Sequence, residues 1–159
     1  MDMIPIHPAL NRRAVLCLVA TLLPSIALGQ GATSNVPREE GTRMKIRIGF
    51  ADQVFTATLE DNGSARNFAS MLPLELTISD FSTNEKIAYL PRKLTALARG
   101  PFPDAVPGDL CYYVPWGNLA FFHGSYESSR DLVRLGRLDG GVEPLLTRGD
   151  FPLRIEPIP

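Results

Sequence analysis

The chain is poor in the residue types that most often reveal a reaction or a crosslink. It has two cysteines and two histidines among 159 residues, and only Cys111 and His123 lie beyond residue 30. A domain with one cysteine forms no internal disulfide, so its stability must come from a hydrophobic core, and we expect Cys111 to be buried and inert. A single histidine without neighbouring cysteines or an acidic cluster predicts no metal site. We therefore expect neither a metal nor another cofactor.

The sequence also lacks an excess of charge of either sign and lacks known catalytic motifs. The chain has 16 Lys and Arg against 17 Asp and Glu, a net charge of -1. No basic surface is predicted that would attract nucleic acid. The sequence contains no phosphate-binding loop, dinucleotide fingerprint, nucleophile elbow or zinc-helix motif. The hydrophobic content of 45% is nonetheless ordinary for one globular domain. No reaction can be assigned from motifs alone.

No apolar run reaches the roughly 20 residues that a membrane-spanning helix needs. The longest begins at Ala14 and is interrupted by Pro24. Two arginines precede this run and small residues follow it, which is the order of a secretory signal peptide over residues 1–29. The arginine pair resembles a twin-arginine export signal, and general secretion is the alternative route. We expect an exported, periplasmic protein without a stable membrane span after cleavage.

The remaining chain divides into a leader and a domain. Residues 30–43, "QGATSNVPREEGTR", have no apolar periodicity and predict a flexible leader. Residues 44–159 consist of short alternating runs such as "MKIRIGF" and "LELTISDF", which predict strands. We expect a helix in "SARNFASM" capped by Ser64, a helical turn at the start of "LTALARG", and a second short helix around residues 142–146. Many short strands with two small helices favour a mainly β, closed or nearly closed barrel.

Residues 109–124, "DLCYYVPWGNLAFFHG", predict a hairpin that is apolar on both faces. Such strands lie centrally in a barrel, with one face filling the barrel and the other covered by a helix or loop. Trp116 falls in the turn "PWGN" and is the residue that core packing explains least. An indole in this place suits the rim of a pocket, where one edge of the ring stays in water.

Mixed charge surrounds a preceding strand and its following loop, at Glu85, Lys86, Arg92 and Lys93. One interpretation is a solvated hairpin and loop; the other is the polar rim of a pocket for a small molecule or peptide. Further along, Gly136 in "RLGR" predicts a β-bulge or a close backbone approach. The second interpretation, combined with the aromatic hairpin, gives these candidate ligand-binding residues: Glu85, Tyr89, Arg92, Tyr113, Trp116 and Phe122.

The domain resembles the small bacterial cyclophilin-like domain proteins, barrel domains of mostly unassigned function. The resemblance covers residues 44–159 and is most specific in "NEKIAYLP", "GDL" and "RLGRLD". It implies a closed eight-stranded barrel capped by two helices, in agreement with the strand pattern. "GNLAFF" is more distantly similar to the cyclophilin strand "GSQFF", which matches Phe122 to a groove phenylalanine of the cyclophilins.

The same resemblance limits the function. Cyclophilins twist an X-Pro bond with an arginine in an apolar groove, and the resemblance puts Ala88 at the position of that arginine. It puts Ala120 at the groove glutamine, and Glu127 and Leu132 at the Trp and His of the groove. Without the arginine, the groove lacks the donor that stabilises the twisted amide.

These observations favour a non-enzymatic function. We expect a monomeric module that binds a small molecule or peptide without catalysis. The alternative is a peptidyl-prolyl cis-trans isomerase with a rebuilt groove, in which Arg92 or Arg134 replaces the missing donor.

Overall fold

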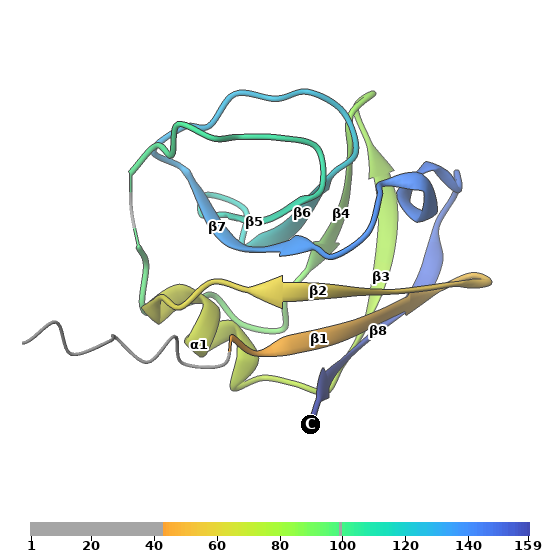
Figure 1. The fold of residues 1–159 in the computed structure, drawn as a ribbon, viewed down its shortest axis with the longest axis horizontal. Coiled ribbons are helices and arrows are strands. Elements are labelled where there is room, and N and C mark those ends of the chain that lie inside the picture. The colour runs from red at the N-terminus through yellow and green to blue at the C-terminus, as the bar shows by residue number, and fades with distance from the viewer. Residues whose placement is uncertain (1–42, 99) are drawn as a thin grey trace, which may run out of the picture. The chain divides into compact units, whose positions relative to one another are not determined.

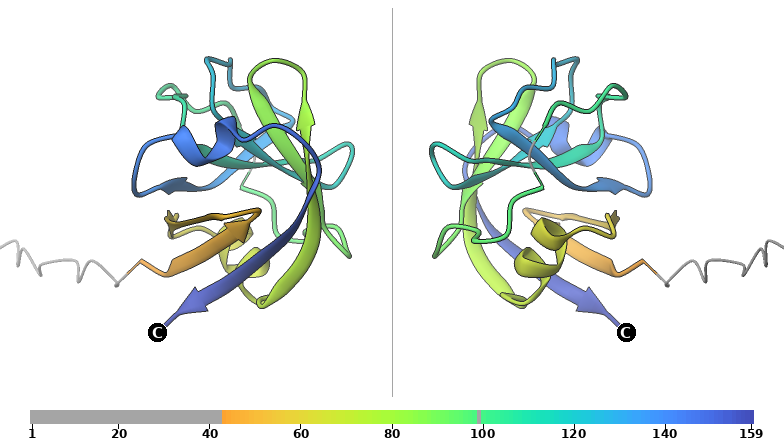
Figure 2. Two further views of the ribbon diagram at one scale, coloured as in Figure 1. Left: turned by 90° about the vertical axis from the view of Figure 1, so that its right-hand side faces the viewer. Right: turned by 90° about the vertical axis from the view of Figure 1, so that its left-hand side faces the viewer.

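The structure, a computed structural model, describes residues 43–98 and 100–159, which form a closed antiparallel β-barrel (Figure 1). The predicted signal peptide, and all of the predicted leader except its last residue, lie outside the described residues. The strands of the described part are β1 (Lys45–Phe50), β2 (Gln53–Leu59), β3 (Leu74–Phe81), β4 (Glu85–Tyr89), β5 (Asp109–Tyr113), β6 (Asn118–Phe122), β7 (Leu132–Leu138) and β8 (Phe151–Ile158). Their order around the barrel is β1-β2-β7-β5-β6-β4-β3-β8. Figure 2 shows β8 beside β1 and β3, the pairings that close the barrel.

The predicted alternation of inward and outward side chains is confirmed. In β1, Ile46 and Ile48 are fully buried while Lys45 and Arg47 face solvent. Each buried isoleucine contributes roughly 2 kcal/mol relative to an exposed one. The same period of two holds in β3 and β8, so the inward residues meet in one core. That core includes Phe50, Leu59, Phe68, Ile78, Leu110, Tyr112, Leu119, Phe121, Leu135, Leu153 and Ile155.

The described residues contain one α-helix and one 3-10 turn, where we expected two helices. Helix α1 (Gly63–Ala69) is capped by Asn62, whose Oδ1 accepts a hydrogen bond from the backbone N–H of Ala65 at 2.8 Å. The prediction of Ser64 as the cap was wrong, because Ser64 is buried and its hydroxyl accepts a bond from Ala98. The second element is η1 (Glu143–Leu146), a single 3-10 turn.

The helical turn expected at the start of "LTALARG" is absent from residues 94–98. The backbone N–H of Leu94 donates to the hydroxyl of Tyr112 at 3.2 Å, and the N–H of Thr95 donates to Asn67 Oδ1 at 3.0 Å. These two bonds attach the start of the segment to β5 and to helix α1. Tertiary contacts override the local preference here.

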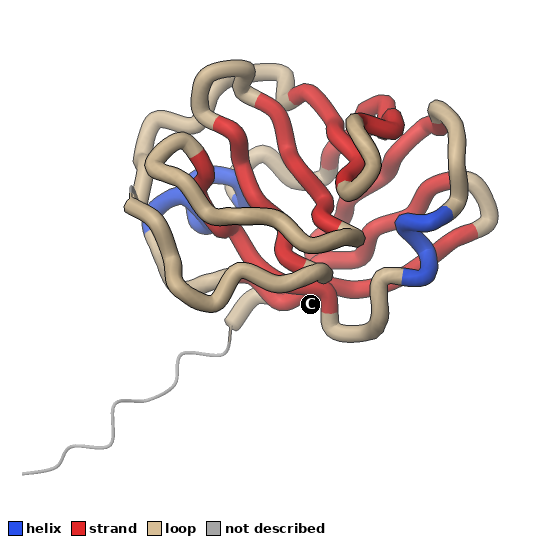
Figure 3. The backbone as a smooth tube through the Cα atoms, turned by 90° about the horizontal axis from the view of Figure 1, so that it is seen from above, coloured by secondary structure: helices blue, strands red, loops and turns tan. Residues whose placement is uncertain are grey.

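The aromatic hairpin is confirmed as β5 and β6, joined by a turn that contains Trp116. Its inner face contributes Leu110, Tyr112, Leu119 and Phe121 to the barrel core. Its outer face contributes Cys111, Ala120 and Phe122 to a second buried cluster, which Leu132 of β7 completes. Phe102 and Tyr126, from two connecting loops, pack on this second cluster, and loop segments lie in front of the strands in Figure 3. The covering is therefore made by loops.

Gly136 combines both predicted features. Leu110 pairs with Gly136 and the next residue of β5 pairs with Arg134, so β7 has one extra residue at this point. A Cβ atom on Gly136 would lie 2.5 Å from the carbonyl oxygen of Thr58 in β2. Only glycine permits the two backbones to approach this closely.

Lys86 lies inside the barrel, which corrects the interpretation of a solvated charged hairpin. Its side chain is fully buried, and its Nζ donates to Asp80 Oδ1 at 2.7 Å. The same Nζ lies 5.6 Å from the ring centre of Phe50 and 5.8 Å from that of Phe151. A buried ammonium requires such partners. Alternation along β4 then directs Glu85, the preceding residue, to the outer face.

Candidate functional site

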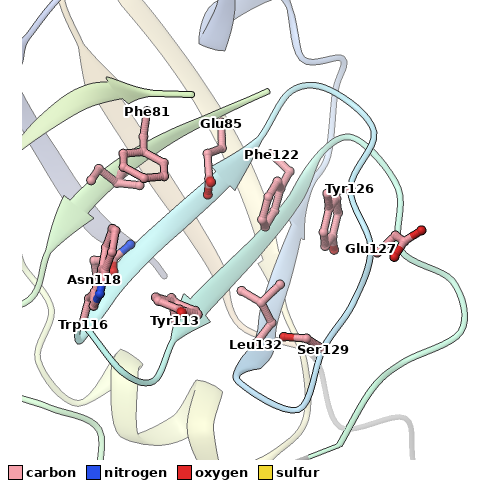
Figure 4. A pocket seen from close by; sticks show the side chains of 11 residues that line it. Phe81, Glu85, Tyr113, Trp116, Asn118, Phe122, Tyr126, Glu127, Ser129 and Leu132 are labelled. Atoms are coloured by element: carbon pink, nitrogen blue, oxygen red, sulfur yellow. The ribbon is translucent and has the colours of Figure 1, made fainter. Parts of the chain in front are cut away.

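The outer face of β4, β6 and β5 holds the candidate site. In the register between β4 and β6, Glu85 pairs with Phe122, Ile87 with Ala120, and Tyr89 with Asn118. These positions share the face that is turned away from the barrel core. A pocket of about 290 Å³ lies on it, and we call it the aromatic pocket (Figure 4). Its lining residues are Phe81, Glu85, Ile87, Tyr113, Trp116, Asn118, Phe122, Tyr126, Glu127, Ser129 and Leu132.

One end of the aromatic pocket is a group of three rings. Trp116 stands nearly perpendicular to Phe81, with ring centres 5.4 Å apart, and nearly perpendicular to Tyr113, at 5.5 Å. The rings come from the end of β3, the end of β5 and the intervening turn of the hairpin. Edge-to-face contacts of this kind hold aromatic rings in defined orientations. Trp116 is still 49% exposed, so its ring is at the mouth of the pocket.

The opposite end is a fixed wall. The ring of Tyr126 stacks on Phe122 with centres 3.6 Å apart. Its hydroxyl donates a hydrogen bond to Asp109 Oδ2 at 2.6 Å. Asp109 Oδ1 accepts a second hydrogen bond from Arg137 Nε, also at 2.6 Å. Burial and the adjacent Asp109 carboxylate both raise the pKa of the Tyr126 phenol. Cys111 lies behind this wall, and burial raises its thiol pKa to about 12, which agrees with the expected inert cysteine.

Two acceptors in the aromatic pocket lack donors. Glu85 is partly buried, and desolvation raises the pKa of its carboxyl group. No hydrogen bond or ion pair reaches that carboxylate from the described residues. Asn118 is only 2% exposed; its Nδ2 donates to the carbonyl of Leu119, but its Oδ1 has no partner within the same residues. A buried acceptor without a donor carries a desolvation cost that a bound donor would relieve.

Four of the predicted site residues meet in the aromatic pocket: Glu85, Tyr113, Trp116 and Phe122. The other two do not line it. Tyr89 is exposed further along β4. The guanidinium of Arg92 lies beside helix α1, within 3.5 Å of Asn67 and 3.3 Å of Ser70.

Sequence reasoning missed several lining residues, most importantly Asn118. Alternation in "NLAFF" places Asn118 on the same face as Phe122, so the period-two pattern contains the signal for it. Phe81 ends a strand remote in sequence, and Tyr126 lies in a loop without periodicity. Only the barrel topology brings these two side chains to the hairpin.

Ala88, the position that the resemblance matches to the cyclophilin arginine, does not face the aromatic pocket. It is buried in the barrel core, on the opposite face of the sheet from Phe122. The outward neighbour on the pocket face is Ile87, which is apolar as well. Arg134 is engaged elsewhere, with Glu60 at 3.0 Å and Asp104 at 2.9 Å. Within the described residues, no lysine or arginine lines the aromatic pocket.

The geometry defines a class of protein, an antiparallel eight-stranded barrel with a preformed pocket on its outer face. The chain belongs to the cyclophilin-like family, whose sequence model matches residues 48–156. Its fold is similar to the solution structure of a hypothetical protein from Archaeoglobus fulgidus, with a TM-score of 0.56 and 16% sequence identity. That similarity covers 75% of this chain and 98% of the archaeal chain. No curated protein sequence matches the chain significantly.

The described residues contain no group of three or more His, Cys, Asp or Glu side chains arranged to hold a metal ion. Among their helices, none has the length and apolar character needed to span a membrane.

Proposed function

We propose that the barrel binds a small molecule, or one side chain of a peptide, in the aromatic pocket without altering it chemically. The observation that carries the proposal is Trp116, a large ring that is 49% exposed yet held between Phe81 and Tyr113. Exposed apolar surface around a concave space is typical of a site that a partner covers. Two-sided burial explains the large residues of β5 and β6, but it does not explain Trp116 in the turn between them.

The size of the aromatic pocket supports a compact ligand. Its volume of about 290 Å³ is at the lower end of small-molecule sites, which start near ~300 Å³. An extended peptide would bury one side chain in it and leave its backbone outside. The wall made by Phe122 and Tyr126 is held by the buried Asp109, so the site is largely preformed and a ligand would order little on binding.

Trp116 is the only tryptophan of the chain, so its fluorescence is the direct test. We expect saturable changes in emission when the purified chain is titrated with members of a metabolite and short-peptide library. A Trp116→Phe variant should be silent in fluorescence while still binding the same compound by calorimetry. If no compound changes the emission, and iodide fails to quench it, Trp116 is not at an open pocket mouth and the proposal fails.

We also propose that the protein acts as a monomer in the periplasm and has no nucleic-acid partner. The support is the signal-like order of residues 1–29 and the near-neutral charge of the chain. Residues 1–30 fused to a reporter should carry it out of the cytoplasm, and retention of the unmodified fusion would contradict the proposal. Retention only after Arg12 and Arg13 are both changed to Lys would identify the twin-arginine route.

A second candidate is the isomerase with a rebuilt groove. The observation in its favour is Phe122, which lies with Ile87 and Leu132 in an apolar part of the aromatic pocket. Against it, neither Arg92 nor Arg134 reaches this pocket, so no guanidinium there can donate to a twisted amide. The binding function therefore has the stronger support.

A further inference from the structure

We propose that the ligand of the aromatic pocket is an organic cation, namely a primary ammonium or guanidinium group on an apolar stem. This inference rests on the proposed binding function and specifies its chemistry. The chemistry is shared by a free amine and by a lysine or arginine side chain of a peptide, and the experiment below separates these two sources.

The first argument is charge. The only charged residues among those that line the pocket are Glu85 and Glu127, both acidic. Two neighbouring cations are engaged elsewhere: Lys86 lies inside the barrel on Asp80, and Lys93 donates to the carbonyl of Pro115 at 3.4 Å without lining the pocket. The side-chain charges that line the pocket are therefore negative, which favours a cation and disfavours carboxylates and phosphates.

The second argument is the position of Glu85. Its carboxylate points into the pocket, toward the space between Phe81, Trp116 and Phe122 (Figure 4). It is partly buried, and within the described residues it has no ion pair and no hydrogen bond. Two other partly buried carboxylates have the cation that Glu85 lacks: Asp80 has Lys86, and Glu60 has Arg134. A bound ammonium or guanidinium would supply the missing counter-charge.

The third argument is the aromatic lining. Cations bind favourably over the faces of Trp, Tyr and Phe rings, and Trp is the best of the three. Phe81 and Tyr113 each stand nearly perpendicular to Trp116, so the face of Trp116 and the faces of these two rings are turned to different sides of the same end of the pocket. The combination of π faces with a carboxylate distinguishes a cation site from a purely apolar one. An apolar stem would lie against Ile87 and Leu132.

The fourth argument concerns hydrogen bonding. Asn118 Oδ1 is a second acceptor without a donor in the described residues. In the β4–β6 register Glu85 pairs with Phe122, and Asn118 lies four residues along β6 from Phe122, a backbone spacing of about 13 Å at 3.3 Å per residue. A ligand that carries its cation at Glu85 and a neutral N–H donor near Asn118 would satisfy both acceptors.

The test uses three probes that share one ring and differ in charge. Benzylammonium, benzyl alcohol and benzoate are titrated into the purified chain, with Trp116 emission and calorimetry as readouts. We expect benzylammonium to bind about tenfold or more tightly than benzyl alcohol, and benzoate not to bind. Glu85→Gln should remove the preference for the ammonium over the alcohol. Glu75→Gln, the same change at an exposed carboxylate outside the pocket, is the matched control and should have no effect.

The two sources of the cation are compared with acetylated, amidated Gly-Lys-Gly and its norleucine analogue. Tighter binding of the lysine peptide than of benzylammonium indicates a peptide side chain, and the reverse order indicates a free amine. Equal affinities for benzylammonium and benzyl alcohol, a preference for benzoate, or an unchanged preference in Glu85→Gln would each overturn the cation inference and leave the binding function intact. If no probe and no library compound binds, both fail together.

Discussion

The hydroxyl of Tyr126 donates to the Oδ2 atom of Asp109 at 2.6 Å. Through this bond a loop residue that stacks on Phe122 is attached to a carboxylate with no solvent exposure. Asp109 also accepts from Arg137 Nε and from the backbone N–H of Val106. The same carboxylate therefore joins β7, the loop before β5 and one wall of the aromatic pocket.

Tyr126→Phe keeps the stacked ring and removes this donor. We expect the free energy of unfolding to fall by about 1–3 kcal/mol, because a buried carboxylate loses a hydrogen bond that water cannot replace. Chemical denaturation measures the difference. Tyr89→Phe is the control, since Tyr89 is exposed on the neighbouring strand and its loss of a hydroxyl should change little. Equal effects of the two substitutions would show that the bond to Asp109 does not stabilise the loop.

The buried pair of Lys86 and Asp80 predicts an asymmetry between its two single substitutions. Asp80→Asn leaves a buried ammonium without its counter-charge and should cost about 3 kcal/mol of unfolding free energy. Lys86→Met fills the same space with an uncharged chain, and Asp80, which is partly exposed, keeps Arg148 at 3.5 Å. This substitution should cost much less, and the double variant should be more stable than Asp80→Asn alone. Denaturation of all three variants checks the order, and a more severe loss in Lys86→Met would contradict it.

Lys86 also shows where sequence reasoning reaches its limit. The alternation that identifies Ile46 and Ile48 as core residues holds throughout the barrel, because in a two-faced strand a side chain's direction follows from its place in the run. Applied to "EKIAY", the same alternation puts Lys86 inside. From the sequence, a lysine is expected to face solvent. Its counter-ion, Asp80, lies on another strand and cannot be recognised from the local pattern. The expected solvated hairpin was wrong for this reason.

Of the four predicted residues that line the aromatic pocket, three belong to the hairpin and Glu85 lies on β4. Tyr113, Trp116 and Phe122 lie on consecutive elements, and their composition identified them. Phe81 and Tyr126 come from a distant strand and from a loop, so their place in the aromatic pocket depends on strand order around the barrel. Local pattern contains no information about that order, and a resemblance to a barrel family supplies the fold without the side chains of the pocket.

Ionisation of the Glu85 carboxyl group should lower the stability of the folded chain and raise its affinity for an organic cation. Desolvation raises the pKa of its carboxyl group in the folded state above the ordinary value of 4.5. The folded chain then holds this proton more tightly than the unfolded chain, so stability falls as pH rises from the ordinary value through the raised one. Glu85→Gln removes this effect and should be at least as stable as the parent near neutral pH.

The same group gives cation binding the reverse dependence. An organic cation needs the ionised carboxylate, so its affinity should rise as pH increases through the raised pKa of Glu85. Thermal unfolding and benzylammonium titrations over the acidic to neutral range measure both effects on one preparation. A Glu85→Gln variant that is clearly less stable near neutral pH would mean that the carboxylate has a stabilising partner, and would contradict both expectations.

The isomerase alternative makes the last prediction. Rotation about an X-Pro bond has a barrier of ~18–20 kcal/mol, and a catalyst must stabilise the twisted amide more than either planar form. Phe122 supplies an apolar surface, but the pocket-facing neighbour on β4 is Ile87, which donates nothing. We expect the purified chain to give the uncatalysed rate in a proline-isomerisation assay with several X-Pro peptides.

The informative comparison is with Phe122→Ala. If the parent chain accelerates isomerisation and this variant does not, the pocket performs catalysis with a donor other than arginine, and the binding-only function is wrong. Acceleration that persists in the variant points instead to a contaminating isomerase, because the apolar floor of the pocket has been removed. A parent rate equal to the blank, together with saturable benzylammonium binding that is weakened in Glu85→Gln, would establish a cyclophilin-like barrel whose outer face recognises a cation and leaves proline bonds unchanged.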